Sequence, residues 1–378
     1  MKTIYLDYSS TTPIDEEVLK EMLPFLKKEY GNASSIHRLG QTAYVAIDKA
    51  RKRIADFLNC SPDQIIFCGS ATEANNLTLQ GFLKDKNNPH IITTSIEHPA
   101  VLNVLKELKT DTTYIDPDKD GLISVEKIRK AIKPNTVLIS VMYANNEIGT
   151  IQPIKEISNF LKTLKQKIYF HTDAVQAVNY LDCDVKKLNV DFLTLSGHKI
   201  YGPKGIGALY VRDKKSLKPI IFGGGQEFNL RSGTENVASI VGMGKAIELI
   251  SKNRKDIKRI QQLRDRIIKE VLRIPGASIN GSITKRLPNN INVSFSGIEG
   301  EGLLMLLNQK GICVSTGSAC SSKELKPSHV LTALGLNPKQ IHGAIRISLG
   351  RYTTKEEIDF FLKILIASVK KLKSISPY

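Results

Sequence analysis

The sequence contains no apolar run that reaches the roughly 18 residues needed to cross a membrane. Residues 1–7 contain neither the apolar core of a secretory signal peptide nor an Arg- and Ser-rich transit segment. The hydrophobic fraction of 41% and the charged fraction of 24% are those of an ordinary globular protein. We therefore expect a cytoplasmic location and no membrane partner.

Cysteine is scarce, with five residues in 378. Because the number is odd and no secretion signal is found, we expect no disulfide framework and at least one free thiol. Metal-binding patterns are also missing, since the sequence has no HExxH, no paired CxxC and no carboxylate cluster. We read Cys60, Cys68, Cys183 and Cys313 as structural, with Cys60 open to exposure.

Acidic residues are outnumbered by basic ones, 37 to 54, which leaves a net charge of +17. Such an excess invites a nucleic-acid hypothesis. Much of it lies on a helical face at 252–259 and in the tail at 370–373, and no basic run is interleaved with aromatic residues. We therefore expect no sequence-specific binding of nucleic acid, while attraction to acidic proteins or to tRNA stays open.

Strand-like and helical segments alternate through the first two thirds of the chain. The strand candidates are short, apolar and rich in β-branched residues: 64–68, 90–94, 136–141, 168–171, 192–195 and 207–211. Strands of this kind suit a mostly parallel sheet that is covered on both faces. The pattern predicts an α/β sandwich.

A helical pattern over 246–274 predicts one long helix that leads into a second domain of the α+β class. In that domain Thr354 and Glu357 have the spacing of a capping box for the closing helix. Its other predicted elements are a strand at 291–295, a helix at 302–310 and a strand at 344–348. We expect a large domain of residues 16–248 and a small domain of residues 1–15 with 249–378.

Polar clusters follow the predicted strands at the positions where α/β proteins bind ligands. Ala71 and Thr72 lie in a turn of small residues that opens a helix and can hold phosphate, although a plain helix cap explains it equally well. His98 can stack on a flat ring and relay protons, or simply begin a helix. Asn146 can hydrogen-bond a ring substituent, or belong to a turn.

The strand at 168–171 runs into Asp173, and Gln176 follows three residues later. A buried carboxylate needs a partner. A protonated pyridine nitrogen is one, because it makes the ring a better electron sink. A metal that also binds His171 and His198 is the alternative.

Lys199 lies in the segment Ser196-Gly197-His198-Lys199 after the strand at 192–195. A lysine held there can form a Schiff base with a carbonyl cofactor, and Ser196 and His198 can bond an anionic group of that cofactor. Taken alone, a solvated surface lysine is the favoured explanation. The ordered set of phosphate turn, stacking base, amide, ring-nitrogen acid and lysine matches pyridoxal 5′-phosphate (PLP) and reverses that preference.

Segments 173–176, 196–199 and 231–236 resemble those of fold-type I PLP enzymes, and specifically the cysteine desulfurases of the class-V aminotransferase-like family. The resemblance covers nearly the whole chain. Segment 315–322 resembles the long mobile loop of the group I desulfurases of iron–sulfur assembly and nitrogen fixation. The resemblance implies a three-layer α/β/α domain, a smaller α+β domain that carries a mobile cysteine loop at about 313–325, and a homodimer.

The resemblance also implies a role for each matching position. Lys199 forms the Schiff base and removes the substrate's α-proton, His98 handles the thiol proton, and Cys320 attacks the substrate sulfur. The implied cofactor-binding residues are Ala71, Thr72, His98, Asn146, Asp173, Gln176, Ser196, His198, Lys199 and, from the other subunit, Thr234. Arg346 is expected to clamp the substrate carboxylate, and Asn32 to lie near the substrate unless it is only a loop residue.

The implied activity converts L-cysteine to L-alanine and leaves the sulfur as a persulfide on Cys320. The expected acceptor is an iron–sulfur scaffold protein or a tRNA-thiolating enzyme, and a transient iron–sulfur cluster at Cys320 is a further option. Three alternatives remain. They are a selenocysteine lyase, another class-V PLP aminotransferase, which would not need Cys320, and a basic binding protein with an inactive PLP fold.

Overall fold

The computed structural model describes residues 3–316 and 327–375. A seven-stranded sheet has the order β2-β8-β7-β6-β5-β3-β4. All neighbours in it are parallel except β8, which is antiparallel to β2 and to β7. The strands are β2 (Ile65–Cys68), β3 (His90–Thr94), β4 (Asp111–Ile115), β5 (Thr136–Ser140), β6 (Tyr169–Asp173), β7 (Phe192–Ser196) and β8 (Gly207–Val211).

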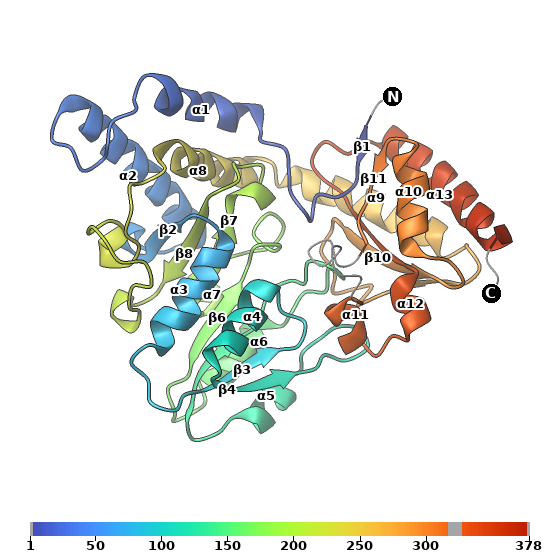
Figure 1. Ribbon diagram of the computed structural model, residues 1–378, viewed down its shortest axis with the longest axis horizontal. Helices are drawn as coiled ribbons and strands as arrows, with labels where there is room; N and C mark the ends of the chain where they lie inside the picture. Colours follow the sequence, from blue (N-terminus) through green and yellow to red (C-terminus); the bar gives the residue numbers. More distant parts are fainter. Residues whose placement is uncertain (1–2, 317–326, 376–378) are drawn as a thin grey trace.

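Helices cover both faces of this sheet, because alternate residues of its buried strands point to opposite sides (Figure 1). Ile65 and Phe67 pack in a core with the helices of one face, whereas Ile66 and Cys68 pack with those of the other. The first face carries α2 (Arg38–Leu58), α5 (Val125–Ala131), α6 (Ile154–Leu161), α7 (Val185–Leu188) and α8 (Val237–Lys252), with α1 (Glu16–Lys27) packed beyond α8. The second carries α3 (Ala71–Leu83) and α4 (Pro99–Leu108). The predicted α/β/α architecture with a mostly parallel sheet is confirmed.

A second group of elements lies at the other end of the molecule (Figure 1). It contains an antiparallel sheet of order β12-β10-β9 and a parallel pair of β1 with β11. The strands are β1 (Ile4–Tyr5), β9 (Ala277–Ile279), β10 (Asn290–Phe295), β11 (Ile312–Cys313) and β12 (Ala344–Ser348). The helices are α9 (Lys255–Val271), α10 (Gly300–Asn308), α11 (His329–Ala333), α12 (Pro338–His342) and α13 (Lys355–Ile375). The chain thus brings its first strand beside elements from its last quarter.

The single helix predicted over 246–274 is wrong, because the chain forms α8 and α9 with a break between them. Asn253 ends α8, and its side-chain Nδ2 bonds to the carbonyl of Leu249 at 2.9 Å. The apolar stripe also changes partners there, since Ile250 packs in the core of the large sheet and Ile260 in the core of the small one. One straight helix would not serve both cores.

The capping box predicted for the closing helix is present. The Thr354 N–H donates to Glu357 Oε2 at 3.1 Å, and the Glu357 N–H donates to Thr354 Oγ1 at 3.2 Å.

The domain boundaries at 15/16 and 248/249 stay a prediction. The residues of the two largest hydrophobic cores divide along the chain close to these boundaries, although α8 runs past residue 248 and Leu287 packs in the core of the large sheet. In the described ranges no helix is long and apolar enough to cross a membrane.

Candidate active site

Most of the predicted cofactor-binding residues lie where the carboxyl ends of the parallel strands meet. Because β2, β3, β5, β6 and β7 run in the same direction, the segments that follow them emerge on one edge of the sheet. Asp173 and Ser196 are the last residues of β6 and β7. Ala71, His98 and Asn146 all lie within six residues of the end of their strands.

Lys199 ends a short 3₁₀ turn (Gly197–Lys199) directly after β7. Its Nζ donates to the backbone carbonyls of Ser9 at 2.5 Å and Ser10 at 2.7 Å. Gln176 Nε2 donates to the same Ser9 carbonyl at 2.9 Å. The N-terminal segment therefore joins two of the predicted cofactor residues.

Asp173 is 6% exposed, and its carboxylate accepts hydrogen bonds from Asn75 Nδ2 at 2.9 Å and from the Val175 N–H at 3.0 Å. Both donors are neutral, so neither brings a positive charge to this buried carboxylate. Asn75 is fully buried, and its Oδ1 has no hydrogen-bond partner among the described residues. Buried groups of this kind suit a ligand that supplies a charged donor.

His98 caps the N-terminus of α4 through Nδ1, which accepts the Ala100 N–H at 3.1 Å. In the neutral ring this bond leaves the proton on Nε2. Burial lowers the pKa of His98, the nearby Asp173 charge raises it, and Lys199 and His329 lower it further. The ring therefore lies within electrostatic reach of both Asp173 and Lys199.

The turn for which phosphate binding is predicted lies at the start of α3. Ser70 Oγ accepts the Glu73 N–H at 3.1 Å, while Ala71 and Thr72 occupy the first two helical positions, whose N–H groups have no intrahelical acceptor. Gly207 of β8 lies between Cys68 and Ser196 in the sheet, and a Cβ on it would be 2.5 Å from the Ser70 carbonyl carbon. This close approach places Ser196 beside the turn.

His198 lies next to the same edge, with its Nδ1 3.1 Å from Thr11 Oγ1. Burial lowers the pKa of His198 to about 4, with help from the charges of Lys199 and Lys204. The ring is therefore neutral near pH 7 and can bind an anionic group only as a hydrogen-bond partner.

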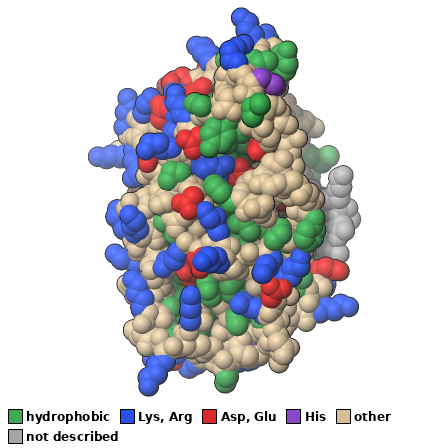
Figure 2. Space-filling model, turned by 90° about the vertical axis from the view of Figure 1, so that its left-hand side faces the viewer, with side chains coloured by type: hydrophobic (Ala, Val, Ile, Leu, Met, Phe, Trp, Pro, Cys, Tyr) green, Lys and Arg blue, Asp and Glu red, His purple; other side chains and the backbone are tan. Residues whose placement is uncertain are grey.

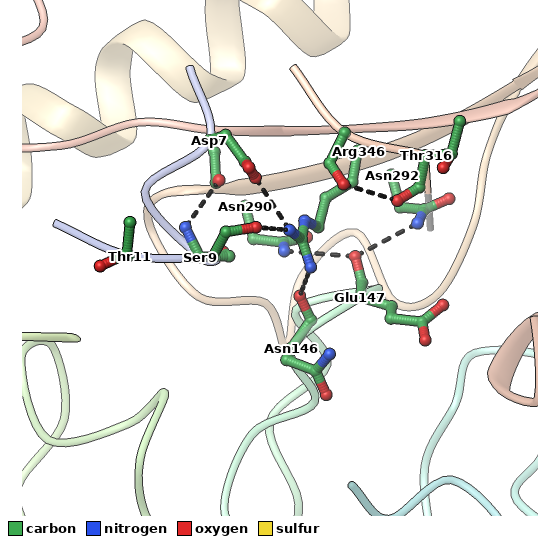
Figure 3. Close-up of polar contacts among 12 residues, drawn as sticks. Asp7, Ser9, Thr11, Asn146, Glu147, Asn290, Asn292, Thr316 and Arg346 are labelled. Atoms are coloured by element: carbon green, nitrogen blue, oxygen red, sulfur yellow. Dashed lines mark hydrogen bonds and ion pairs between the residues drawn. The ribbon is translucent and has the colours of Figure 1, made fainter. Parts of the chain in front are cut away.

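Arg346 of β12 is 2% exposed and points toward the N-terminal segment (Figure 3). Its Nη1 donates to the Asn146 carbonyl at 3.1 Å, and its Nη2 donates to Asp7 Oδ1 at 2.8 Å and to Ser10 Oγ at 2.7 Å. Its Nε has no partner among the described residues. The side chain of Asn146 points away from the guanidinium (Figure 3), so only its backbone takes part in this contact.

Glu147 ties the two groups of elements together beside Arg346. Its backbone carbonyl accepts Nδ2 of both Asn290 and Asn292 at 3.2 Å (Figure 3), and its Oε2 accepts Ser328 Oγ at 2.5 Å. Burial raises the pKa of Glu147 to about 7. His329, next in sequence to Ser328, places Nε2 3.0 Å from the Glu97 carbonyl.

Two predicted site residues of the described ranges, Asn32 and Thr234, are not joined to this cluster within the chain. Asn32 is exposed on the loop between α1 and α2, where its Oδ1 accepts the Ser34 N–H at 2.9 Å, and Thr234 is exposed on the loop before α8. Cys320 lies outside the described residues. The flank before it reaches the site, because Ser315 exchanges two backbone hydrogen bonds with Arg346 at 2.6 and 3.1 Å.

Sequence reasoning missed the contribution of residues 7–12, which contact Lys199, Gln176, His198 and Arg346. A signal was present. Four hydroxyl residues in succession, 9–12, offer four side chains that can each donate and accept a hydrogen bond. Asn75 was also missed, because nothing in a helical pattern distinguishes it from an ordinary buried amide.

The model of the family described as aminotransferase class-V matches residues 4–361 of the chain. Among curated relatives, the "Cysteine desulfurase IscS" of Dictyoglomus turgidum is 49% identical, with 100% of this chain and 97% of the relative covered. The protein of that name from Methanosarcina thermophila is 50% identical, with 100% and 94% covered. The chain belongs to the class-V aminotransferase family.

Solved structures agree with that assignment. A "NifS-like protein" superposes with a TM-score of 0.93 at 38% identity, covering 98% of this chain and 100% of the other. "SspA in complex with cysteine" superposes with a TM-score of 0.82 at 40% identity, covering 93% and 100%. Class-V aminotransferase enzymes work with PLP. The residues here fit it, since the buried Asp173, the unpartnered Asn75 Oδ1 and the open helix start at Ala71 lie along one sheet edge.

Proposed function

We propose that the chain is a PLP-dependent cysteine desulfurase, which converts L-cysteine to L-alanine and holds the sulfur as a persulfide on Cys320. One observation carries the substrate class. The Ser10 carbonyl accepts Lys199 Nζ at 2.7 Å, and the Ser10 hydroxyl accepts Arg346 Nη2 at 2.7 Å. The lysine that would carry the cofactor and the arginine that would bind a carboxylate thus both contact Ser10, which suits an α-amino acid as substrate.

When bound, PLP supplies a ring that withdraws electrons from the α-carbon of the amino acid. Asp173 would hold the proton of the ring nitrogen, and its own position is fixed by Asn75 and the Val175 N–H. Lys199 would take the α-proton. Ala71 and Thr72 would receive the phosphate at the start of α3, together with the neutral His198 and the buried Ser196.

His98 would stack on the ring and donate a proton at Nε2. This assignment follows from the Ala100 N–H, which occupies Nδ1 and so leaves Nε2 as the protonated nitrogen of the neutral ring. Because burial keeps the pKa of His98 low, the ring stays neutral at pH 7 and keeps this single orientation.

Cys320 would act as the sulfur acceptor. Its thiolate attacks the sulfur of the substrate, so that an S–S bond forms while the C–S bond breaks, and the electron pair stays on the carbon, which takes a proton to become alanine. Support comes from the flanks of its segment. Ser315 pairs with Arg346 before it, and Ser328 and His329 bond to Glu147 and Glu97 after it.

Mass spectrometry tests this proposal directly. Protein incubated with L-cysteine should gain the mass of one sulfur atom on Cys320 while alanine accumulates. Cys320→Ser should lose both signals, whereas Cys60→Ser, the control at another thiol that is not fully buried, should keep them. Alanine produced at the wild-type rate by Cys320→Ser would rule the persulfide step out.

The proposal includes a homodimer. The end of the molecule formed by α1, α2 and residues 221–228 exposes large apolar side chains: Leu26, Tyr30, Ile36, Tyr44, Val45, Phe222 and Phe228. Figure 2 views this end and shows hydrophobic side chains lying between basic ones. A cavity of about 560 Å³ there is lined by Ser34 of one loop and Phe228 of another. A second copy covering this end would bury these residues and bring Asn32 and Thr234 near an interface.

Sulfur delivery to an iron–sulfur scaffold protein or to a tRNA-thiolating enzyme completes the proposal. The correct acceptor would take the sulfur from the persulfide, so the added mass on Cys320 should fall when that acceptor is supplied. An acceptor that leaves the persulfide intact is excluded by the same measurement.

A further inference from the structure

Arg346 is paired in this structure with a carboxylate of the chain itself. Asp7 Oδ1 lies 2.8 Å from Nη2, and the two side chains are only 19% and 3% exposed. Nη2 also donates to Ser10 Oγ at 2.7 Å, and Nη1 donates to the Asn146 carbonyl. Nε is left without a partner among the described residues, and Nη1 uses one of its two N–H groups. Both pairs of N–H groups that a guanidinium can offer a carboxylate include Nη2, so neither pair is free for a two-bond contact with a second carboxylate while Asp7 and Ser10 hold Nη2.

A substrate carboxylate that binds Arg346 must therefore either displace Asp7 or bind close to its negative charge. If it takes the Nη2 position, it replaces Asp7. If it binds beside Nε, it places a second negative charge within a few ångströms of the Asp7 carboxylate, and like charges at that distance repel strongly where water is excluded. Both routes make Asp7 weaken the binding of an anionic ligand.

The backbone around Asp7 is fixed, so only its side chain can yield. Residue 7 forms a bridge to Ser348, and the Ser348 N–H donates to the Leu6 carbonyl at 2.8 Å. The Ser9 N–H donates to Ser348 Oγ at 2.8 Å. Turning a short carboxylate side chain is a small movement, and it leaves the contacts of Ser9 and Ser10 with Lys199 in place.

We propose that Asp7 is a positioning residue that occupies Arg346 in the absence of substrate and competes with the α-carboxylate of the amino acid. This inference rests on the proposed function, because it takes Arg346 as the carboxylate site. It has two consequences. Ligands without an α-carboxylate gain nothing from Arg346, and Asp7 returns to the guanidinium as alanine leaves, so that product release does not leave a buried cation unpaired.

The chain offers a matched control. Asp15 Oδ2 lies 2.7 Å from Arg351 Nη1, with side chains 12% and 11% exposed. This pair also joins the N-terminal segment to the residues after β12, but none of its contacts reaches Lys199 or Arg346. Asp15 caps α1, a position at which Asn serves equally well.

The experiment compares Asp7→Asn with Asp15→Asn in the PLP-loaded enzyme. Removal of the charge from residue 7 should lower the KM for L-cysteine and the Kd for L-alanine by about tenfold, a change equal to about 1.4 kcal/mol. Asp15→Asn should leave both constants at the wild-type value. The Kd for alanine is measured by titration calorimetry, which separates binding from turnover.

An unchanged or increased Kd in Asp7→Asn would overturn the inference, as would an equal decrease in Asp15→Asn. If Asp7→Asn does not fold, Asp7→Ser provides the same test with a neutral acceptor. Failure of the proposed function looks different, because no variant, nor the wild type, would then form alanine from L-cysteine.

Discussion

Replacing Gly207 by alanine should weaken PLP binding by moving the start of α3. The added Cβ would lie 2.5 Å from the Ser70 carbonyl carbon, 2.7 Å from its oxygen and 2.8 Å from the Ala71 nitrogen. These are backbone atoms, so no side chain can turn aside. To bring the nearest contact from 2.5 Å to an ordinary 3.4 Å, the turn must retreat by about 0.9 Å.

Overpacking of this kind costs about 1–3 kcal/mol. Gly207 lies between β2 and β7, so the strain falls on the two strands that precede the proposed phosphate turn and Lys199. Because the N–H groups of Ala71 and Thr72 move with the turn, we expect the PLP dissociation constant to rise at least about tenfold.

The assay titrates apo-protein with PLP and follows cofactor absorbance, with thermal unfolding of the apo-protein measured in parallel. Gly302→Ala in α10 is the control, because its Cβ would meet only Leu372 Cδ2 at 3.7 Å. A helical Gly→Ala change there should be neutral or stabilise the protein by up to about 1 kcal/mol. If Gly207→Ala bound PLP with wild-type affinity, the close approach would have no role in the site.

Two further predictions concern stability. Burial raises the pKa of Glu97 to about 8, because the protonated carboxyl is favoured in the folded protein. This preference contributes fully to the free energy of unfolding below about pH 4.5, and the contribution is lost as the pH rises to about 8. The side chain of Glu97→Gln cannot ionise. In urea unfolding, the free energy of unfolding of this variant should therefore rise relative to that of the wild type by up to about 1.4 kcal/mol per pH unit across that range. A difference that stays constant with pH would contradict the shifted pKa. Thr354→Ala removes one half of the capping box of α13 and should cost about 1 kcal/mol in the same assay, and an unchanged midpoint would mean that the cap contributes nothing.

The six predicted strands of the large sheet agree with the structure to within two residues at each end, because each is a buried apolar run with no competing pattern. β4 was missed, since Asp111, Thr112 and Thr113 make it a polar edge strand. The antiparallel direction of β8 also could not be predicted from the sequence. Direction depends on the connections between strands, whereas an apolar run reports burial only.

For the site, the proximity of His98, Asp173 and Lys199 followed from one physical rule, since polar residues after parallel strands emerge on one edge. The partners of Arg346 could not be predicted in this way. Asp7 and Ser10 reach it because β1 pairs with β11, three hundred residues later, and no local pattern encodes such a pairing. The prediction of one continuous helix in place of α8 and α9 failed for a related reason. The apolar stripe is continuous in the sequence, and nothing in it shows that its residues pack in two different cores.

The pairing of the first strand with the last quarter of the chain also sets the order in which this enzyme can become active. Ser9 bonds to Ser348, a separation of 339 residues, whereas β3 and β4 of the large sheet pair His90 with Asp111. Contacts of such long range close late, because the whole intervening chain must already be arranged. A molecule whose large sheet is complete would thus still lack the carboxylate site that we propose around Arg346. Mild denaturant that frees β1 should abolish substrate binding before the large sheet unfolds.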